Sequence, residues 1–312
     1  MKNRFLFITR VVVALQAVFC VEISAAFTLY SAAKDGKQIT LLAALHAWPN
    51  NISSLQKISD LRADIALADG LVFETNFWEQ TPGIEINSIL SEQMAGHRLD
   101  QGVLSEAAIK NIKFLVRKLP EERQLPWKTL NTFHPYIHFI SLSCENTKET
   151  QSYAKGFDFE IHVMAKSLGK SIYFTQDGAS QFRSFVNSDV HRWSQVFEDS
   201  INRFSCQDEK DSTPLESLAS LYIAGDDVAA FKMAVTDSPL PWMATYVESA
   251  NNTQAAYLLN LNSSVNRIFA VIGWSHLIGN NSVISILQRY GYEVQRCKET
   301  CVSLTGNSRI SR

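Results

Sequence analysis

Short apolar runs that stop abruptly at polar residues recur along the chain, and longer segments with a different period separate them. Apolar runs bounded in this way are typical of strands buried on both faces of a sheet. The predicted strands are Ile39–Leu45, Leu71–Phe73, Ser171–Thr175, Ile268–Ile272 and Tyr292–Gln295. The intervening segments carry apolar residues at spacings of three and four, which indicates helices. The predicted helices are Ser53–Leu67, Ser105–Leu119, Trp127–Ser141, Phe157–Leu168, Leu215–Ala234, Met243–Leu261 and Val283–Tyr290.

Buried strands connected by helices predict an α/β fold with a mixed or mostly parallel central sheet flanked by helices. The block from about 86 to 168 shows only helical patterns, so we expect it to form an inserted or capping subdomain. A polar segment from about 206 to 214 ends in proline and is predicted to be a surface loop joining the two halves. Residues 27–312 are expected to form one domain.

The composition and charge of the chain restrict the kinds of molecule that it is expected to bind. The 312 residues are 46% hydrophobic, which is enough to bury a sizeable core. The 29 basic and 31 acidic side chains are spread along the chain and give a formal charge of −2. Without a basic stripe to follow phosphates, nucleic acid is not expected as a partner.

Residues 1–26 have the pattern of a signal peptide. Basic residues come first, the apolar run Val11–Val21 follows, and Ser24-Ala25-Ala26 resembles a cleavage site. Because the apolar run is only 11 residues long, an uncleaved membrane anchor is the weaker alternative. We therefore expect an exported protein of the periplasm or cell envelope, with no stable membrane span after cleavage.

Four cysteines follow this segment, at positions 144, 206, 297 and 301. In an exported chain an even number of cysteines permits disulfides. Cys297 and Cys301 could close a small loop, which would leave Cys144 to pair with Cys206. Four ordinary buried thiols remain the alternative.

Polar residues end four of the predicted strands. These residues are His46, Glu74, Gln176 with Asp177, and His276, which follows Gly273. In open α/β sheets ligands bind beyond the carboxyl ends of the strands, so these side chains could share one pocket. Two imidazoles and a carboxylate are ligands for a divalent transition metal, which would support hydrolysis. The alternative is that both histidines are hydrogen-bonded structural residues.

Other sequence patterns give weaker evidence for a catalytic or metal-binding site. His134 and His138 stand four apart on a predicted helix, but no glutamate accompanies them as in a His-Glu-x-x-His motif. The chain also has no Gly-x-Ser-x-Gly elbow, no phosphate-binding loop and no Gly-x-Gly-x-x-Gly. A serine hydrolase or a nucleotide-dependent enzyme is therefore disfavoured.

Several segments resemble one known family in order along the chain. They are LLAALHAWP at 41–49, ADGLVFETN at 68–76, GFDFEIHVMAKSLGKSIYF at 156–174 and FAVIGWSHLIGNNSVISILQRYGYEVQRC at 269–297. Together they resemble the TraB/GumN family, which is related to the Tiki metalloproteases, over roughly residues 39–297. The resemblance implies a metal-dependent protease with His46, Glu74 and His276 as metal ligands. It also implies that Asp158 supports the site.

The chain departs from the family pattern at three places. Ala43 replaces the glycine of the first Gly-x-x-His motif, and Pro239-Leu240 replaces an Arg-Asn pair. Gln176 stands where the family has a glutamate, and an amide cannot act as a base. Asp177 is the possible substitute for that acid.

Three hypotheses follow from the resemblance and its departures. The first is an exported hydrolase of peptide or amide bonds that uses manganese, cobalt or zinc, with Asp158 or Asp177 assisting. The second is a non-catalytic envelope protein that binds or sequesters a peptide or glycan in the same pocket. The third is a structural subunit whose histidines lie apart in the core.

Overall fold

The computed structural model describes residues 27–49, 61–76, 80–117, 121, 124–135, 138, 153–186, 190–203, 214–238, 242–297 and 301. The predicted signal peptide, the loop from 206 to 213 and most of the predicted helix Ser53–Leu67 lie outside these residues.

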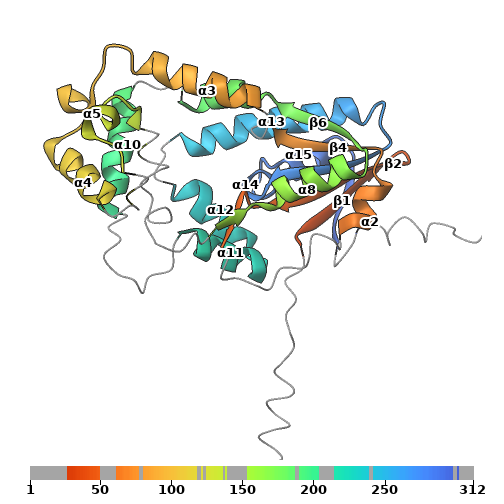
Figure 1. Cartoon of the computed structure of the whole chain (residues 1–312). Coiled ribbons are helices and arrows are strands. Elements are labelled where there is room, and N and C mark those ends of the chain that lie inside the picture. Colours follow the sequence, from red (N-terminus) through yellow and green to blue (C-terminus); the bar gives the residue numbers. More distant parts are fainter. Residues whose placement is uncertain are drawn as a thin grey trace, which may run out of the picture.

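A six-stranded sheet forms the centre of the molecule, in the order β6-β4-β7-β2-β1-β8 (Figure 1). Its strands are β1 (Leu29–Lys34), β2 (Lys37–Ala44), β4 (Gly70–Thr75), β6 (Ser171–Gln176), β7 (Arg267–Gly273) and β8 (Glu293–Cys297). Strands β2, β7, β4 and β6 are parallel neighbours, whereas β1 pairs with β2 and β8 in the antiparallel sense. The predicted α/β fold with a mixed sheet is therefore confirmed.

The strand β1 was missed, although the chain carries a strong local signal for it. Lys34 pairs with Lys37 across a two-residue turn made by Asp35 and Gly36, whose φ angles are 50° and 77°. Asp-Gly is a preferred dipeptide in such hairpin turns because both central residues need a positive φ. The Asp-Gly pair therefore explains why the antiparallel edge begins here.

Helices cover both faces of this sheet. The helix α8 (Phe157–Ser167) lies at the end of the predicted helical block, but Phe157, Ile161 and Ala165 are buried in the same apolar core as the strands. The other helices in contact with this core are α2 (Arg62–Leu67), α11 (Pro214–Ala224), α12 (Asp227–Phe231), α13 (Met243–Leu261), α14 (Trp274–Leu277) and α15 (Val283–Arg289).

The predicted helix Leu215–Ala234 is divided in the structure. It ends at Ala224, Gly225 takes a φ of 67°, and Asp226 begins α12 by accepting a hydrogen bond from Ala229 N–H. The π-helical turn η4 (Lys232–Thr236) follows. Glycine at a helix end and aspartate at a helix start are both favourable signals, and here they outweigh the continuous apolar pattern.

A second group of helices packs away from the sheet (Figure 1). It comprises α3 (Gln80–Gln93), η2 (Leu99–Val103), α4 (Glu106–Val116), α5 (Trp127–Leu130), α9 (Gly178–Val186) and α10 (Val190–Arg203). Two apolar clusters of their own hold these helices together, one around Ile112 and Phe197 and the other around Trp193. Helices α9 and α10 were not predicted, although α10 carries apolar residues three and four apart, at Val190, Trp193 and Phe197, all of which are buried.

Burial of two histidines in this helical group makes stability depend on pH. His134 and His138 are 1% and 2% exposed, and burial lowers the pKa of each ring from 6.5 to about 4. The unfolded chain therefore binds more protons between these two values. We expect the free energy of unfolding to fall on acidification from about pH 6.5 to 4, by roughly 1.4 kcal/mol per pH unit for each ring.

Urea unfolding at several pH values measures this slope. His138→Gln keeps an amide donor for the Leu130 carbonyl, to which His138 Nε2 is bonded at 3.0 Å, but removes the titration. This variant should lose about half of the slope and show a constant offset above pH 7. An unchanged slope in the variant would show that His138 does not contribute to the pH dependence of stability.

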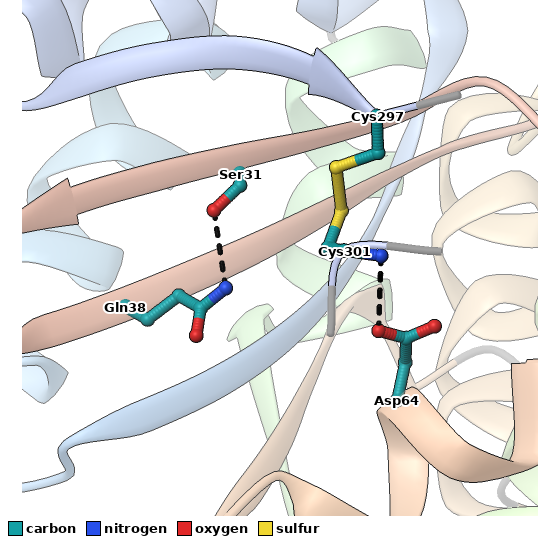
Figure 2. The surroundings of a disulfide bond; sticks show 5 residues. All are labelled: Ser31, Gln38, Asp64, Cys297 and Cys301. Carbon is teal, nitrogen blue, oxygen red and sulfur yellow. Dashed lines mark hydrogen bonds between the residues drawn. A yellow bond between two sulfur atoms is a disulfide. The ribbon is translucent and has the colours of Figure 1, made fainter. Parts of the chain in front are cut away.

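A disulfide joins Cys297, at the end of β8, to Cys301 (Figure 2). Cys301 N–H donates to Asp64 Oδ1 at 3.2 Å, which connects the end of the sheet to α2. This bond is one of the pairings that the sequence allowed, whereas Cys144 and Cys206 lie outside the described residues.

We expect loss of this disulfide to lower the free energy of unfolding by about 2 kcal/mol, because it closes a loop with a sequence separation of only 4. The comparison is between the oxidised chain and Cys297→Ala/Cys301→Ala by urea unfolding. Equal unfolding midpoints would show that the bond adds no stability.

Candidate functional site

Glu74 is the centre of a polar cluster at the carboxyl end of β4. Its side chain is buried, and both of its oxygens have partners. Oε2 accepts from Gly273 N–H at 3.2 Å, and Oε1 accepts from Gln181 Nε2 at 3.1 Å. Thr175 in the neighbouring strand donates to the Glu74 carbonyl at 2.9 Å, so the backbone is held as well.

His276 reaches this carboxylate from the next strand of the sheet. Strand β7 ends at Gly273, and the short helix α14 turns His276 back over the strand end. His276 Nε2 lies 3.3 Å from Glu74 Oε1, and its Nδ1 lies 2.7 Å from Asn251 Oδ1. The ring is 5% exposed.

His46 reaches the carboxylate from β2, and it lies two residues beyond the end of that strand. Its Nε2 lies 3.7 Å from Glu74 Oε2, and its Nδ1 lies 2.8 Å from Asp158 Oδ2 in the first turn of α8. In contrast to His276, its side chain is 60% exposed. The cluster is therefore open to solvent on the His46 side.

Gly273 keeps the space between these groups free. A Cβ atom there would lie 3.1 Å from both Glu74 Oε2 and His46 Nε2, and 3.4 Å from His276 Cδ2. The strand order explains the convergence, because β4, β7 and β2 are adjacent and parallel and so end at one edge.

Gly156 allows α8 to approach β2 closely. Its N–H donates to the His46 carbonyl at 3.1 Å. A Cβ atom at this position would overlap the Leu45 and His46 backbones and lie 2.6 Å from Asp158 Oδ1. A side chain at position 156 would therefore prevent the close approach that brings Asp158 to His46. The two-stranded sheet of β3 (Ala47–Pro49) and β5 (Tyr153–Lys155) joins the same two segments.

The cluster strongly perturbs two pKa values. Partial desolvation beside Glu74 and Asp158 would lower the pKa of His46, but the hydrogen bond with Asp158 and the charges of Glu74 and Asp158 raise it to about 9. Burial would raise the pKa of Glu74, but its interactions with His276, His46 and Gly273 N–H hold that pKa far below its ordinary value. Glu74 is therefore a carboxylate at neutral pH. The site combines this anion with imidazoles whose Nε2 atoms face it.

Gln176 and Asp177 lie at the end of β6, and no hydrogen bond or ion pair among the described residues joins them to this cluster. Gln176 pairs with Thr75, so strand alternation directs it to the face opposite Glu74. Asp177 is exposed, and its carboxylate accepts from Ser180 N–H at 2.8 Å at the start of α9. This bond lowers the pKa of Asp177.

The other two departures from the family pattern have different outcomes. Ala43 is fully buried in β2, and its carbonyl accepts from Tyr222 Oη at 2.8 Å. Tyr222 in turn accepts from Thr28 N–H at 3.0 Å, which connects this strand to the first described residues. Pro239-Leu240 lies outside the described residues.

Two residues of the cluster were missed at the sequence level. Asn251 stands in the middle of α13, and Gln181 in α9 lies five residues beyond Gln176. The signal for Asn251 is a polar residue on the mostly apolar buried face of α13, which it shares with Gln254. No local pattern marks Gln181, because its role arises from the packing of α9 against β4.

The donor atoms suit a divalent cation in kind and in spacing. Adjacent nitrogen and oxygen ligands of a tetrahedral ion with bonds of about 2.0–2.1 Å lie roughly 3.3–3.4 Å apart. The distances of 3.3 Å and 3.7 Å from Glu74 to the two Nε2 atoms are close to this value. As the side chains stand, however, no group of three or more His, Cys, Asp and Glu in the described part of the chain could hold a metal ion.

A separate cleft lies at the other end of the sheet. Its volume is about 850 Å³, and its lining includes Lys34, Lys37 and Arg267. Lys37 Nζ is bonded to the carbonyls of Asn262 and Ser263 at 2.7 Å each, so this cation supports the fold. The lining includes none of the predicted site residues, and the chemistry is concentrated at the Glu74 end.

The fold and the cluster define an α/β protein with a His-Glu-His site at the carboxyl ends of three parallel strands. The model of the TraB/PrgY/gumN family matches residues 28–296, and the chain belongs to this family. The resemblance seen in the sequence is therefore confirmed. Neither the curated proteins nor the solved structures include a match. Among the residues that the structure describes, no helix is both long and apolar enough to span a membrane.

Proposed function

We propose that this chain is an exported, metal-dependent hydrolase of peptide or amide bonds. One observation carries the proposal. His46 Nε2 and His276 Nε2 both face the carboxylate of Glu74, while the Nδ1 atom of each ring is held by another side chain. Histidines that bind metals are usually oriented in this way, with the second ring nitrogen hydrogen-bonded to an oxygen.

The orientation of each ring supports this interpretation. Asp158 and Asn251 Oδ1 act as acceptors, so Nδ1 carries the hydrogen in both rings. The Nε2 atoms are then the positions available for a proton or a cation. His46, Glu74 and His276 would hold manganese, cobalt or zinc, and such an ion supplies a nucleophilic water at neutral pH and polarises a carbonyl.

The residues around the cluster have separable roles in this proposal. Glu74 provides the negative charge, and Gly273 N–H and Gln181 fix its two oxygens. Asp158 orients His46. Substrate would approach from the His46 side, because that ring is largely exposed whereas His276 is buried.

Two further observations favour this function. The Cys297–Cys301 disulfide is typical of proteins outside the reducing cytosol, which supports export to the periplasm or cell envelope. The structural-subunit hypothesis required the two histidines to lie apart, but both contact Glu74. The peptide or amide substrate is inferred from the relationship to the Tiki metalloproteases.

The test combines metal analysis with a peptidase assay on the purified exported chain. We expect manganese, cobalt or zinc to bind with defined stoichiometry and to stimulate cleavage of a peptide library, and His276→Ala to lose both properties. A wild-type chain that neither binds these metals nor cleaves any peptide with them present would exclude the proposal.

The second candidate is a protein that binds or sequesters a peptide or glycan without turnover. Gln176 favours it, because an amide stands where the family has an acid, and its side chain lies on the face opposite Glu74. Peptide-binding and peptidase assays on the wild-type chain with Co²⁺ present distinguish the two. Binding without cleavage would indicate a binding protein, whereas turnover would exclude the binding role.

A further inference from the structure

Asn251 connects His276 to the helix α13. It is 3% exposed, and both ends of its side-chain amide are hydrogen-bonded. Oδ1 lies 2.7 Å from His276 Nδ1, and Nδ2 donates to the Asn281 carbonyl at 2.8 Å. A buried amide with both ends bonded has one favourable orientation.

The Asn281 carbonyl determines that orientation. A carbonyl oxygen can only accept, so the atom of Asn251 that faces it must be the NH₂ group. The oxygen of the same amide then faces His276, and the ring must donate from Nδ1. Reversing the amide would place oxygen against oxygen and NH₂ against Nδ1–H, which would break both bonds.

Asn281 is itself fixed to α13. Its Nδ2 donates to Glu248 Oε1 at 2.9 Å, and Glu248 lies one helical turn before Asn251. The turn that follows His276 is therefore attached to α13 at two successive turns of the helix. This attachment keeps the Asn281 carbonyl opposite Asn251.

We propose that Asn251 is a positioning residue that holds His276 with a hydrogen on Nδ1 and directs Nε2 at Glu74. The effect on a bound cation rests on the proposed function, but the position of the ring hydrogen does not. Asn251 touches neither Glu74 nor the substrate side of the cluster in any described contact. Its action on the site passes through the imidazole.

Asn251→Leu removes the acceptor with little change in volume. The matched control is Asn252→Leu, which places the same side chain at the next, exposed position of α13, where Asn252 Nδ2 donates to the Glu248 carbonyl. The direct measurement is a long-range ¹H–¹⁵N spectrum of the metal-free chain, which reports which ring nitrogen of His276 carries hydrogen. The His276 signals are assigned by their absence in His276→Gln.

We expect the Nδ1-bound hydrogen of His276 in the wild type and in Asn252→Leu, and its loss or mixing with the Nε2-bound form in Asn251→Leu. The affinity for Co²⁺ should fall about 10- to 100-fold in Asn251→Leu alone, as for other groups that orient a metal-binding histidine.

A wild-type spectrum in which His276 lacks the Nδ1 hydrogen overturns the proposal even if the Leu variant fails to fold. An unchanged His276 spectrum in a folded Asn251→Leu chain overturns it as well. Unchanged Co²⁺ affinity in that variant would remove the role toward the cation. If the wild type binds no Co²⁺, the proposed function fails, while the spectra still decide the role of Asn251.

Discussion

Glu74→Gln is expected to abolish metal binding and hydrolysis while the chain remains folded. Among the described residues, the carboxylate of Glu74 is the anionic group that both Nε2 atoms face, at 3.3 Å and 3.7 Å. A neutral amide would not offset the charge of a divalent cation, so affinity for Co²⁺ should fall by more than about 100-fold. Hydrolysis should fall by at least about 100-fold.

The fold should tolerate this change because the hydrogen bonds around Glu74 can be preserved. The amide oxygen of the new glutamine can still accept from Gly273 N–H. Gln181 can offer its own Oε1, which has no hydrogen-bond partner among the described residues, to the new NH₂ group. Circular dichroism and calorimetric Co²⁺ titration measure the two properties.

Glu160→Gln is the matched control, since Glu160 is an exposed glutamate on α8, two residues beyond Asp158. It should keep full Co²⁺ affinity and activity. A Glu74→Gln chain that binds Co²⁺ as well as this control would show that the carboxylate does not hold the cation.

Gly156→Ala is expected to have the largest effect on stability of any single methyl addition near the site. The added Cβ would overlap the backbones of Leu45 and His46, and backbone atoms cannot move aside as a flexible side chain can. Overpacking of this kind typically lowers the free energy of unfolding by about 1–3 kcal/mol or more. Movement of α8 away from β2 would also separate Asp158 from His46.

Gly169→Ala separates this steric effect from glycine's conformational role. Gly169 has a φ of 63° and no atom near the position of a Cβ, so the variant should lose only about 1–2 kcal/mol from backbone strain and keep its activity. Gly156 has an ordinary φ of −64°, so its effect is purely steric. Urea unfolding and peptidase assays of both variants test the difference. A Gly156→Ala chain with wild-type activity and stability would show that α8 does not approach β2 this closely.

Much of the parallel sheet could be predicted because its strands are buried on both faces and read as apolar runs. Strand β7 is buried along its length after Arg267, and the predicted strand Ile268–Ile272 differs from it by one residue at each end. Strand β1 could not be recognised in this way, since LYSAAK is short and weakly apolar and depends on pairing with β2 and β8. The Asp-Gly turn was the signal for it.

The candidate site likewise contains some residues that the sequence predicted and others whose orientation it could not predict. His46, Glu74 and His276 follow apolar runs, and the ends of neighbouring parallel strands must meet at one edge. Gln176 also follows an apolar run, but alternation along β6 directs it to the other face. Whether a residue at a strand end faces the cluster depends on strand register, which apolar content does not reveal.

By itself the sequence determined the α/β class, the family and the strand ends that bear the candidate site residues. The local pattern of apolar residues indicates which segments are buried strands and in which order they follow. Only the tertiary structure decided that Asn251 and Gln181 hold His276 and Glu74 and that Gly156 must lack a side chain. These contacts join residues that are distant in the chain or on opposite faces of an element. They depend on how the helices pack against the sheet, which no local sequence pattern specifies.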